Sequence, residues 1–262
     1  NRNEKIFALP CMKIALYYAA FASVAMLVTG HSSAVTVTLT QPEKLAALEG
    51  HFETQTRAPL YIFGWVDDEA QTIKGLKIDG LLSLFCYNDI NASVAGLRDL
   101  PSTEFLKSLH PDADDAEIAK IRPQYWAPVN FSFQTFRIMV YLGGAMCVMI
   151  AMGLFAYYRG TLNPPKGAIA KIFLIWSMPS VLMPLIASQV GWASAEVGRQ
   201  PWIVWHLMKT SDAATTSASA GEIIFSIVIF TTLFTAITVV GIKVLFDKIR
   251  DGYPVEQIEN KG

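Results

Sequence analysis

Four long apolar stretches without a charged residue dominate this sequence of 262 residues. They cover residues 14–30, 138–158, 172–195 and 223–242, and the first can be extended through residues 33–37. A bilayer core about 30 Å thick needs about 20 apolar residues in helical conformation, so each stretch is predicted to be a transmembrane helix. Pro179 and Pro184 lie inside the third stretch, which a membrane helix tolerates better than a soluble helix does.

The composition supports a membrane protein. Charged residues make up only 16% of the chain, against about 25% in an ordinary soluble domain, and hydrophobic residues make up 52%. These values exclude a disordered chain, a coiled coil and an ordinary cytosolic enzyme. The net charge of −1 provides no basic field that would attract nucleic acid. Cys11, Cys86 and Cys147 have neither metal-type spacing nor the pattern of a disulfide framework.

The predicted fold class is therefore all-α: a polytopic membrane protein with four transmembrane helices and a long, partly helical external loop. We divide the chain into a first transmembrane helix (1–36), the external loop (37–130) and three further transmembrane helices (131–262). Basic residues flank the helices on one side, which the positive-inside rule makes cytoplasmic. These residues are Arg2, Lys5, Lys13, Arg159, Lys166, Lys171, Lys243, Lys248 and Arg250.

The loop at 37–130 is too long to be a simple connection, so it is expected to be functional or to have structure of its own. It contains 14 acidic and 8 basic residues, a balance that suits the external side. Residues 42–54 place Leu45, Leu48 and Phe52 on one face of a short amphipathic helix. Residues 103–110 and 115–121 are also predicted to be helical, and residues 64–68 are predicted to form a turn.

Glu196 is the first candidate for chemistry, because it directly follows an uncharged stretch. A carboxylate within a membrane is costly and usually has a partner or a function. Trp192, Glu196 and Arg199 follow at i, i+4 and i+7 and share one helix face. One interpretation is an interfacial Glu–Arg ion pair with tryptophan anchors, and the other is a metal or proton site.

Arg137 and Met139 are the second candidate, within the sequence Phe136-Arg137-Ile138-Met139 at the start of the second stretch. In the simple interpretation Arg137 snorkels to the interface and Met139 fills the core. In the functional interpretation the thioether of Met139 binds haem iron and raises its reduction potential, with the guanidinium close by.

Lys44 and Glu49 are the third candidate, in Lys44-Leu45-Ala46-Ala47-Leu48-Glu49 of the loop. Five positions separate them, so they do not face each other as a helical ion pair. They are either part of a solvated polar face or a pair that binds and deprotonates a substrate at the membrane edge. In the second case the carboxylate takes a proton and the ammonium holds an oxygen.

The remaining residues give little support to other chemistry. The four histidines are spread along the chain, and each is interpreted as an interfacial or surface residue: His31, His51, His110 and His206. The sequence contains no Walker loop, GxGxxG, CxxC pair, HExxH or nucleophile elbow. Hydrolase and nucleotide-binding functions therefore have no support.

Taken together, the three candidate segments resemble subunit I of the bacterial cytochrome bd quinol oxidases. The most specific match is Gly198-Arg199-Gln200-Pro201-Trp202 with Gly191-Trp192 and Glu196 before it. The segments around Arg137 and Lys44 follow the same family pattern, and the likeness covers almost the whole chain.

The resemblance implies a haem-containing subunit of a terminal oxidase that oxidises quinol, reduces dioxygen to water and generates a proton gradient. The implied cofactors are low-spin and high-spin haem b, with haem d or a further haem b as the third. Met139 would bind the low-spin haem iron, with Arg137 beside that haem. Glu196 would bind the high-spin haem iron, and Trp192 and Arg199 would flank the haems.

The resemblance also implies the setting of this chemistry. Lys44 and Glu49 would act on the quinol side, within the external Q loop of the family. The implied partners are subunit II of the oxidase, a small accessory subunit, membrane lipid, quinol and dioxygen, with no nucleic acid. The location would be the bacterial inner membrane, with the Q loop on the periplasmic side.

The family subunit has nine transmembrane helices, whereas four are predicted here. The chain is therefore expected to be a C-terminal fragment or a split subunit, without the histidine ligands of the other half. Two other functions remain open. One is a non-enzymatic transporter or channel subunit with Glu196 on an ion path. The other is a haemless structural partner of such an oxidase.

Overall fold

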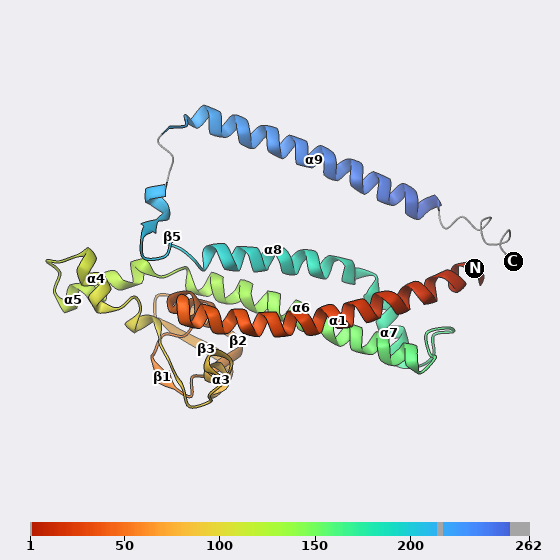
Figure 1. The fold of residues 1–262 in the computed structure, drawn as a ribbon, viewed down its shortest axis with the longest axis horizontal. Coiled ribbons are helices and arrows are strands. Elements are labelled where there is room, and N and C mark those ends of the chain that lie inside the picture. Colours follow the sequence, from red (N-terminus) through yellow and green to blue (C-terminus); the bar gives the residue numbers. More distant parts are fainter. Residues whose placement is uncertain (1, 214–216, 252–262) are drawn as a thin grey trace. The chain divides into compact units, whose positions relative to one another are not determined.

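The computed structural model describes residues 2–213 and 217–251 (Figure 1). The end of the predicted segment 131–262, from residue 252 onward, lies outside the described residues, as do residues 214–216. The chain divides into two compact units: Lys13–Ala213, and Asn1–Met12 with Ala214–Gly262. The candidate residues all belong to the first of these units.

The membrane-spanning helices agree in part with the predicted four. Among the described residues, three helices are long and apolar enough to cross a bilayer. These are α1 (Arg2–Thr40, apolar from Ala8), α6 (Val129–Tyr158) and α9 (Ala220–Asp251). A fourth span exists only if the bent pair of α7 (Gly167–Ser177) and α8 (Leu182–Val197) is counted as one, because its two parts meet at 52°.

A proline accounts for that bend. The short 3-10 helix η3 (Pro179–Val181) separates α7 from α8, and Pro179 begins it. A proline has no N–H to donate and clashes with the preceding turn, so the α-helix breaks there. The third predicted helix is therefore two helices, while Pro184 is accommodated in the first turn of α8.

Small residues allow the helices of the first unit to pack closely. Helix α6 lies alongside both α7 and α8 (Figure 1). A methyl group at Gly153 of α6 would come within 2.6 Å of Phe173 and 2.7 Å of Leu16. The glycine thus allows α1 and α7 to approach α6, as small residues commonly do between membrane helices.

The segment between α1 and α6 contains both helices and strands. Its helices are α2 (Pro42–Glu49), α3 (Leu81–Tyr87), α4 (Thr103–Leu109) and α5 (Asp115–Ile121), with 3-10 helices η1 (Leu97–Asp99) and η2 (Arg122–Tyr125). The predictions at 103–110 and 115–121 are confirmed within one residue. Ser102 and Asp114 cap these two helices by accepting the N–H groups of Phe105 and Glu117.

The prediction of a mostly helical membrane protein is confirmed, but the chain is not all-α, because three two-stranded antiparallel sheets are present among the described residues. They pair β1 (Gln55–Thr56) with β4 (Ser93–Val94), β2 (Leu60–Asp67) with β3 (Thr72–Ile78), and β5 (Trp202–Val204) with β6 (Met208–Lys209). After β6 comes the 3-10 helix η4 (Thr210–Ala213). The predicted turn at 64–68 is also wrong, since residues 64–67 continue β2 and the turn begins at Asp68.

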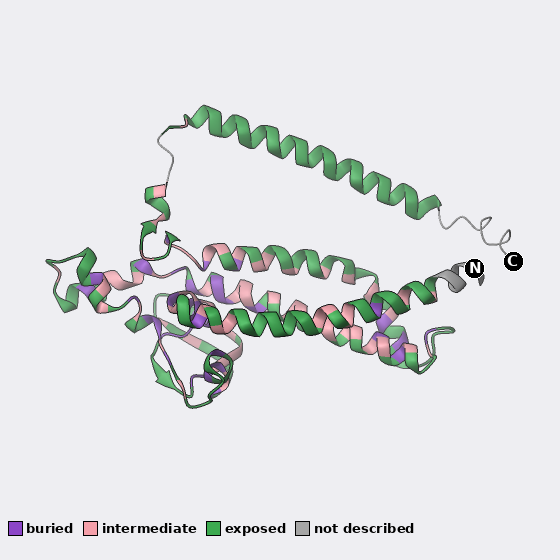
Figure 2. Ribbon diagram, in the orientation of Figure 1, coloured by how far each residue is buried: buried purple, intermediate pink, exposed green. Residues whose placement is uncertain are grey.

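A small core joins this segment to the start of α6. Buried side chains from α2, β2, η1 and α6 meet there, and Figure 2 shows burial concentrated in this part of the chain. The cluster comprises Ala46, Phe52, Val66, Leu97, Val129 and Phe133. Burial of this apolar surface fixes α2 against α6, which decides where the polar residues of α2 point.

Helix α2 ends earlier than predicted, at Glu49 instead of residue 54, and Gly50 caps it. Gly50 has a left-handed backbone (φ +63°), and its N–H bonds to the carbonyls of Ala46 and Ala47. A methyl group there would lie 3.1 Å from both Ile73 and Val66. The chain turns at this glycine, because other residues rarely adopt this conformation.

Gly50→Ala is therefore expected to destabilise the complete protein by about 1–3 kcal/mol, from backbone strain together with crowding. Gly160→Ala is the matched control, because Gly160 has the same φ of +63° but open space around it. It should cost only about 1 kcal/mol. Thermal unfolding of the purified protein measures both, and equal effects would show that crowding at Gly50 contributes nothing.

Candidate functional site

Helix α2 carries two of the predicted residues, and they point to different neighbours. Glu49 contacts Arg137 of α6, whereas Lys44 lies in the field of Glu196 and Arg199 at the end of α8. The expectation that Lys44 and Glu49 do not face each other is thus confirmed. One short helix connects both of the other candidate segments.

Glu49 and Arg137 form a buried ion pair. Oε2 of Glu49 accepts a hydrogen bond from the Arg137 guanidinium, and only 7% and 5% of the two side chains are exposed. The rings of Phe133 and Phe136 lie 4.8 and 5.5 Å from the guanidinium carbon, so cation–π attraction adds to the pairing. Of the two interpretations of Arg137, the one in which it snorkels to the interface is wrong, because the side chain is buried and Glu49 compensates its charge inside the protein.

Burial raises the pKa of the Glu49 carboxyl above its ordinary value of 4.5, and Arg137 offsets part of that rise. A carboxylate removed from water binds a proton more readily, since the low dielectric disfavours its charged form. Glu49 is therefore a stronger base than an exposed glutamate, which is a property suited to taking a proton from a substrate.

Glu196 and Arg199 form a half-exposed ion pair across one turn at the end of α8. Their charged atoms are 2.5 Å apart, with 45% and 39% of the side chains exposed. Burial lowers the pKa of the nearby Lys44, Arg199 lowers it further, and Glu196 acts in the opposite direction. Because Lys44 is half-buried, its ammonium is poorly hydrated and available to hold a substrate oxygen.

Met139 faces α8 and contacts Gly191. A methyl group at Gly191 would come within 2.7 Å of the Met139 sulfur, so only glycine leaves room for the thioether at its present position. Trp192 is largely exposed on the next position of α8. The structure therefore places Met139 against α8, the helix that carries Glu196.

Sequence reasoning missed a second polar cluster at the other end of α2. Glu43 is buried, and its two carboxylate oxygens lie 2.9 Å from Nε1 of Trp205 and 2.9 Å from Nε2 of His206. These partners are in the β5–β6 hairpin. In the sequence, only the position of Glu43 directly before Lys44 pointed to this cluster. His206 was interpreted as an interfacial or surface residue, and nothing in the sequence linked it to Glu43.

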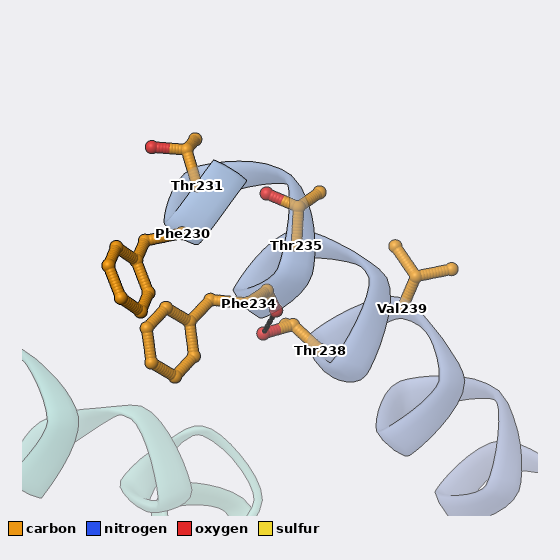
Figure 3. Close-up of a pocket in the computed structure, with 6 residues that line it drawn as sticks. All are labelled: Phe230, Thr231, Phe234, Thr235, Thr238 and Val239. Carbon is orange, nitrogen blue, oxygen red and sulfur yellow. Dashed lines mark hydrogen bonds between the residues drawn. The ribbon is translucent and has the colours of Figure 1, made fainter. Parts of the chain in front are cut away.

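A hollow on α9 is formed by one helix alone. Figure 3 shows the side chains that line it, with the Thr238 hydroxyl bonded to the Phe234 carbonyl at 2.8 Å. The lining residues are Phe230, Thr231, Phe234, Thr235, Thr238 and Val239. Every described residue of α9 is exposed (Figure 2), as expected of a helix surface that faces lipid or another chain. The hollow has no charged side chain in its lining, so the candidate site is sought around α2.

Comparison with known proteins identifies the family. The profile described as cytochrome bd terminal oxidase subunit I matches residues 1–253. This chain belongs to the cytochrome bd terminal oxidase subunit I family. Its apolar helices and this membership make it a multi-pass membrane protein.

Individual cytochrome bd relatives agree. The cytochrome bd ubiquinol oxidase subunit 1 of Bacillus subtilis (strain 168) is 28% identical over 256 residues, which are 96% of this chain and 51% of that protein. The cytochrome bd-II ubiquinol oxidase subunit 1 of Escherichia coli (strain K12) is 25% identical over 307 residues, 98% of this chain and 58% of that protein. The bd oxidase structure from Geobacillus thermodenitrificans has a TM-score of 0.66 and 30% identity, covering 94% of this chain and 49% of that one. The chain thus spans about half the length of the relatives it matches.

The cytochrome bd family implies haem, and the described residues suit it in two respects. Nε of Arg137 and Nε of Arg199 are buried, and neither has a hydrogen-bond partner among the described residues. A buried N–H without a partner is costly, and a carboxylate such as a haem propionate would satisfy it. Among the described residues, no cluster of three or more His, Cys, Asp or Glu side chains is present.

Proposed function

We propose that this chain forms the quinol-oxidising region and part of the haem-binding region of a cytochrome bd quinol oxidase. The assembled enzyme would oxidise quinol, reduce dioxygen to water and generate a proton gradient. The observation that carries this proposal is the position of α2. Its Glu49 contacts the Arg137 segment and its Lys44 lies beside the Glu196–Arg199 pair, so a substrate on α2 would be close to both candidate haem segments.

Lys44 and Glu49 have complementary roles in this proposal. The ammonium of Lys44 holds a quinol oxygen, while the carboxylate of Glu49, whose pKa is raised by burial, accepts a proton from the quinol. Arg137 keeps that carboxylate in place through their ion pair. Each quinol releases two protons and two electrons, and dioxygen needs four of each to form two waters.

Haem would supply the electron transfer and the oxygen chemistry. Met139 would hold the iron of the low-spin b haem, and Glu196 would hold the iron of the high-spin b haem. Arg137 and Arg199 would each donate their free Nε–H to a haem carboxylate. Trp192 would flank a haem, as the family resemblance implies. The third haem, d or b, would take its ligand from elsewhere in the assembled subunit.

The remaining parts of the proposal concern location and partners. The enzyme would lie in the bacterial inner membrane, with residues 37–130 as a Q loop on the periplasmic side. Its partners would be subunit II and a small accessory subunit. Membership of the cytochrome bd family favours the oxidase over a transporter or channel. Only the carboxylate of Glu196, at the end of an apolar helix, supports a transporter or channel.

Lys44→Met in the complete oxidase tests the proposal. It should lower kcat/KM for quinol by about 10- to 100-fold, which corresponds to loss of one hydrogen bond from a charged group. The reduced-minus-oxidised haem bands should not change. Quinol-driven oxygen consumption and the difference spectrum of membranes measure the two effects. Lys120→Met is the control, because Lys120 is exposed on α5. Wild-type membranes without haem bands, or equal kinetics in both variants, would contradict the proposal.

A further inference from the structure

Glu43, Trp205 and His206 form a second polar cluster, which the proposed chemistry of Lys44 and Glu49 does not use. Glu43 follows Pro42 in the first turn of α2 and is buried. Oε2 accepts the Trp205 indole N–H at 2.9 Å, and Oε1 lies 2.9 Å from Nε2 of His206. A buried carboxylate with both oxygens engaged is fixed in orientation, unlike one on a solvated helix face.

The imidazole of His206 is also fixed. Its ring stacks on Phe105 at 3.9 Å and on Trp205 at 4.0 Å, with interplanar angles of 13° and 22°. The backbone of His206 is left-handed (φ +58°), a conformation that non-glycine residues adopt rarely and at some cost. The fold therefore holds the backbone of His206 in a conformation that it would rarely adopt alone. In this conformation the imidazole is within hydrogen-bonding distance of Glu43.

A small cavity lies beside Glu43 and Trp205. Its volume is about 20 Å³, enough for one water molecule, and its lining includes Glu43, Lys44, Arg199 and Trp205. Exposure then rises along the pair, from 10% of the Glu43 side chain to 22% of the His206 side chain. The cavity, the Glu43 carboxylate and the His206 imidazole therefore form a continuous path from Lys44 to the solvent.

We propose that Glu43 and His206 form a proton relay from the cavity beside Lys44 to the solvent. The inference rests on the proposed function, because the protons are those of a quinol held by Lys44. Glu49 accepts one of the two quinol protons. The O–H bond at the quinol oxygen that Lys44 holds breaks, and this second proton passes to the Glu43 carboxylate, from there to the imidazole of His206 and then to water. The electron leaves to a one-electron oxidant, a role that haem iron would supply in the assembled oxidase. Glu43 and His206 return to their starting states, so only the quinol is oxidised.

Trp205 is a positioning residue in this relay. Its indole N–H holds one oxygen of Glu43, which leaves the other oxygen aimed at His206, and its ring forms one side of the stack. Lys44 and Arg199 are the cations at the cavity, and they favour movement of a proton away from the cavity and toward the solvent.

The test uses Glu43→Gln and His206→Gly in the complete oxidase. Glutamine keeps the size of the side chain and an acceptor for Trp205 but does not take up a proton. Glycine suits the left-handed backbone and leaves a gap between Phe105 and Trp205. Both variants should slow quinol-driven oxygen consumption on the order of 100-fold, the scale of a lost acid–base group. Oxygen consumption driven by a one-electron donor without transferable protons should not change, nor should the haem bands.

Added imidazole distinguishes a proton relay from a structural role. It should restore quinol oxidation to His206→Gly and not to Glu43→Gln, because it fits the gap left by the ring it replaces. The matched control is His110→Gln, since His110 bonds to the Tyr125 hydroxyl at 2.9 Å in the same region and lies outside the pair. It should oxidise quinol at the wild-type rate.

Three results would overturn the relay. In the first, both variants oxidise quinol within about twofold of the wild type, although general acid–base groups contribute far more. In the second, they lose activity with the proton-free donor to the same degree, which would make the cluster structural. In the third, the haem-containing wild-type enzyme consumes oxygen with the proton-free donor but not with quinol. That result would remove the proposed quinol function together with the relay, and it is distinct from the first two.

Discussion

Met139→Leu is expected to abolish the low-spin b haem band in the complete oxidase while leaving the haem that Glu196 would bind. Leucine has nearly the volume of methionine, so the substitution should cost less than about 1.5 kcal/mol of stability. It has no sulfur, so it supplies no axial ligand to iron. The reduced-minus-oxidised spectrum of membranes measures the loss, with the amount of protein determined on the same sample.

Met146→Leu is the matched control for this experiment. Met146 lies two turns farther along α6, on the same helix face as Met139, and is also partly buried. Both variants exchange a thioether for an isobutyl group in a similar environment. Loss of the band in Met139→Leu alone would assign the ligand. An unchanged spectrum in both would remove Met139 from the haem site and leave it as a packing residue against Gly191.

The expected loss depends on the position of the Met139 sulfur. Gly191 allows the thioether to lie against α8, and haem is the group that we propose this sulfur binds. Motif and geometry are separate lines of support here. The motif comes from local sequence around Arg137, while the contact to Gly191 depends on how α6 and α8 pack.

The membrane helices were predictable because hydropathy is a local property of the sequence. The bend in the third helix follows from Pro179, although the sequence does not say whether a proline kinks a helix or divides it. The β2–β3 hairpin was missed because Gly64 suggested a turn. In the structure Gly64 pairs with Gly75, and a methyl group at Gly75 would clash with the Phe63 carbonyl, so the two glycines allow the strands to approach.

The candidate site was predictable as a set of residues but not as a set of contacts. Local spacing correctly separated Lys44 from Glu49 on α2. The partner of Arg137 lies 88 positions away, and the partner of Glu43 lies 163 positions away, so no local pattern reveals either pair. Burial of Arg137 likewise depends on the core that α2 shares with α6, which forms only in the tertiary structure.

Arg137→Leu is expected to destabilise the complete protein by about 3–5 kcal/mol, the largest stability effect of the substitutions considered. It leaves the Glu49 carboxylate buried without its cation, and an uncompensated buried charge is costly. Arg98→Leu is the control, because Arg98 makes the same kind of ion pair with Glu53 at 2.8 Å on an exposed surface. An exposed pair contributes about 0–1 kcal/mol. Denaturant or thermal unfolding of the purified oxidase measures both.

The pH dependence of that loss separates charge from packing. Burial already raises the pKa of Glu49, and removal of Arg137 removes the group that lowers it. A carboxyl with a raised pKa in the folded state is least costly when it is protonated, so the penalty of Arg137→Leu should shrink as the pH falls toward the ordinary glutamate pKa of 4.5. The double variant Arg137→Leu with Glu49→Gln should recover much of the stability at neutral pH, because no buried charge remains. A penalty that is independent of pH and equally large in the double variant would mean that Arg137 acts through its contacts with Phe133 and Phe136, and the ion pair would then contribute little to holding α2 on α6.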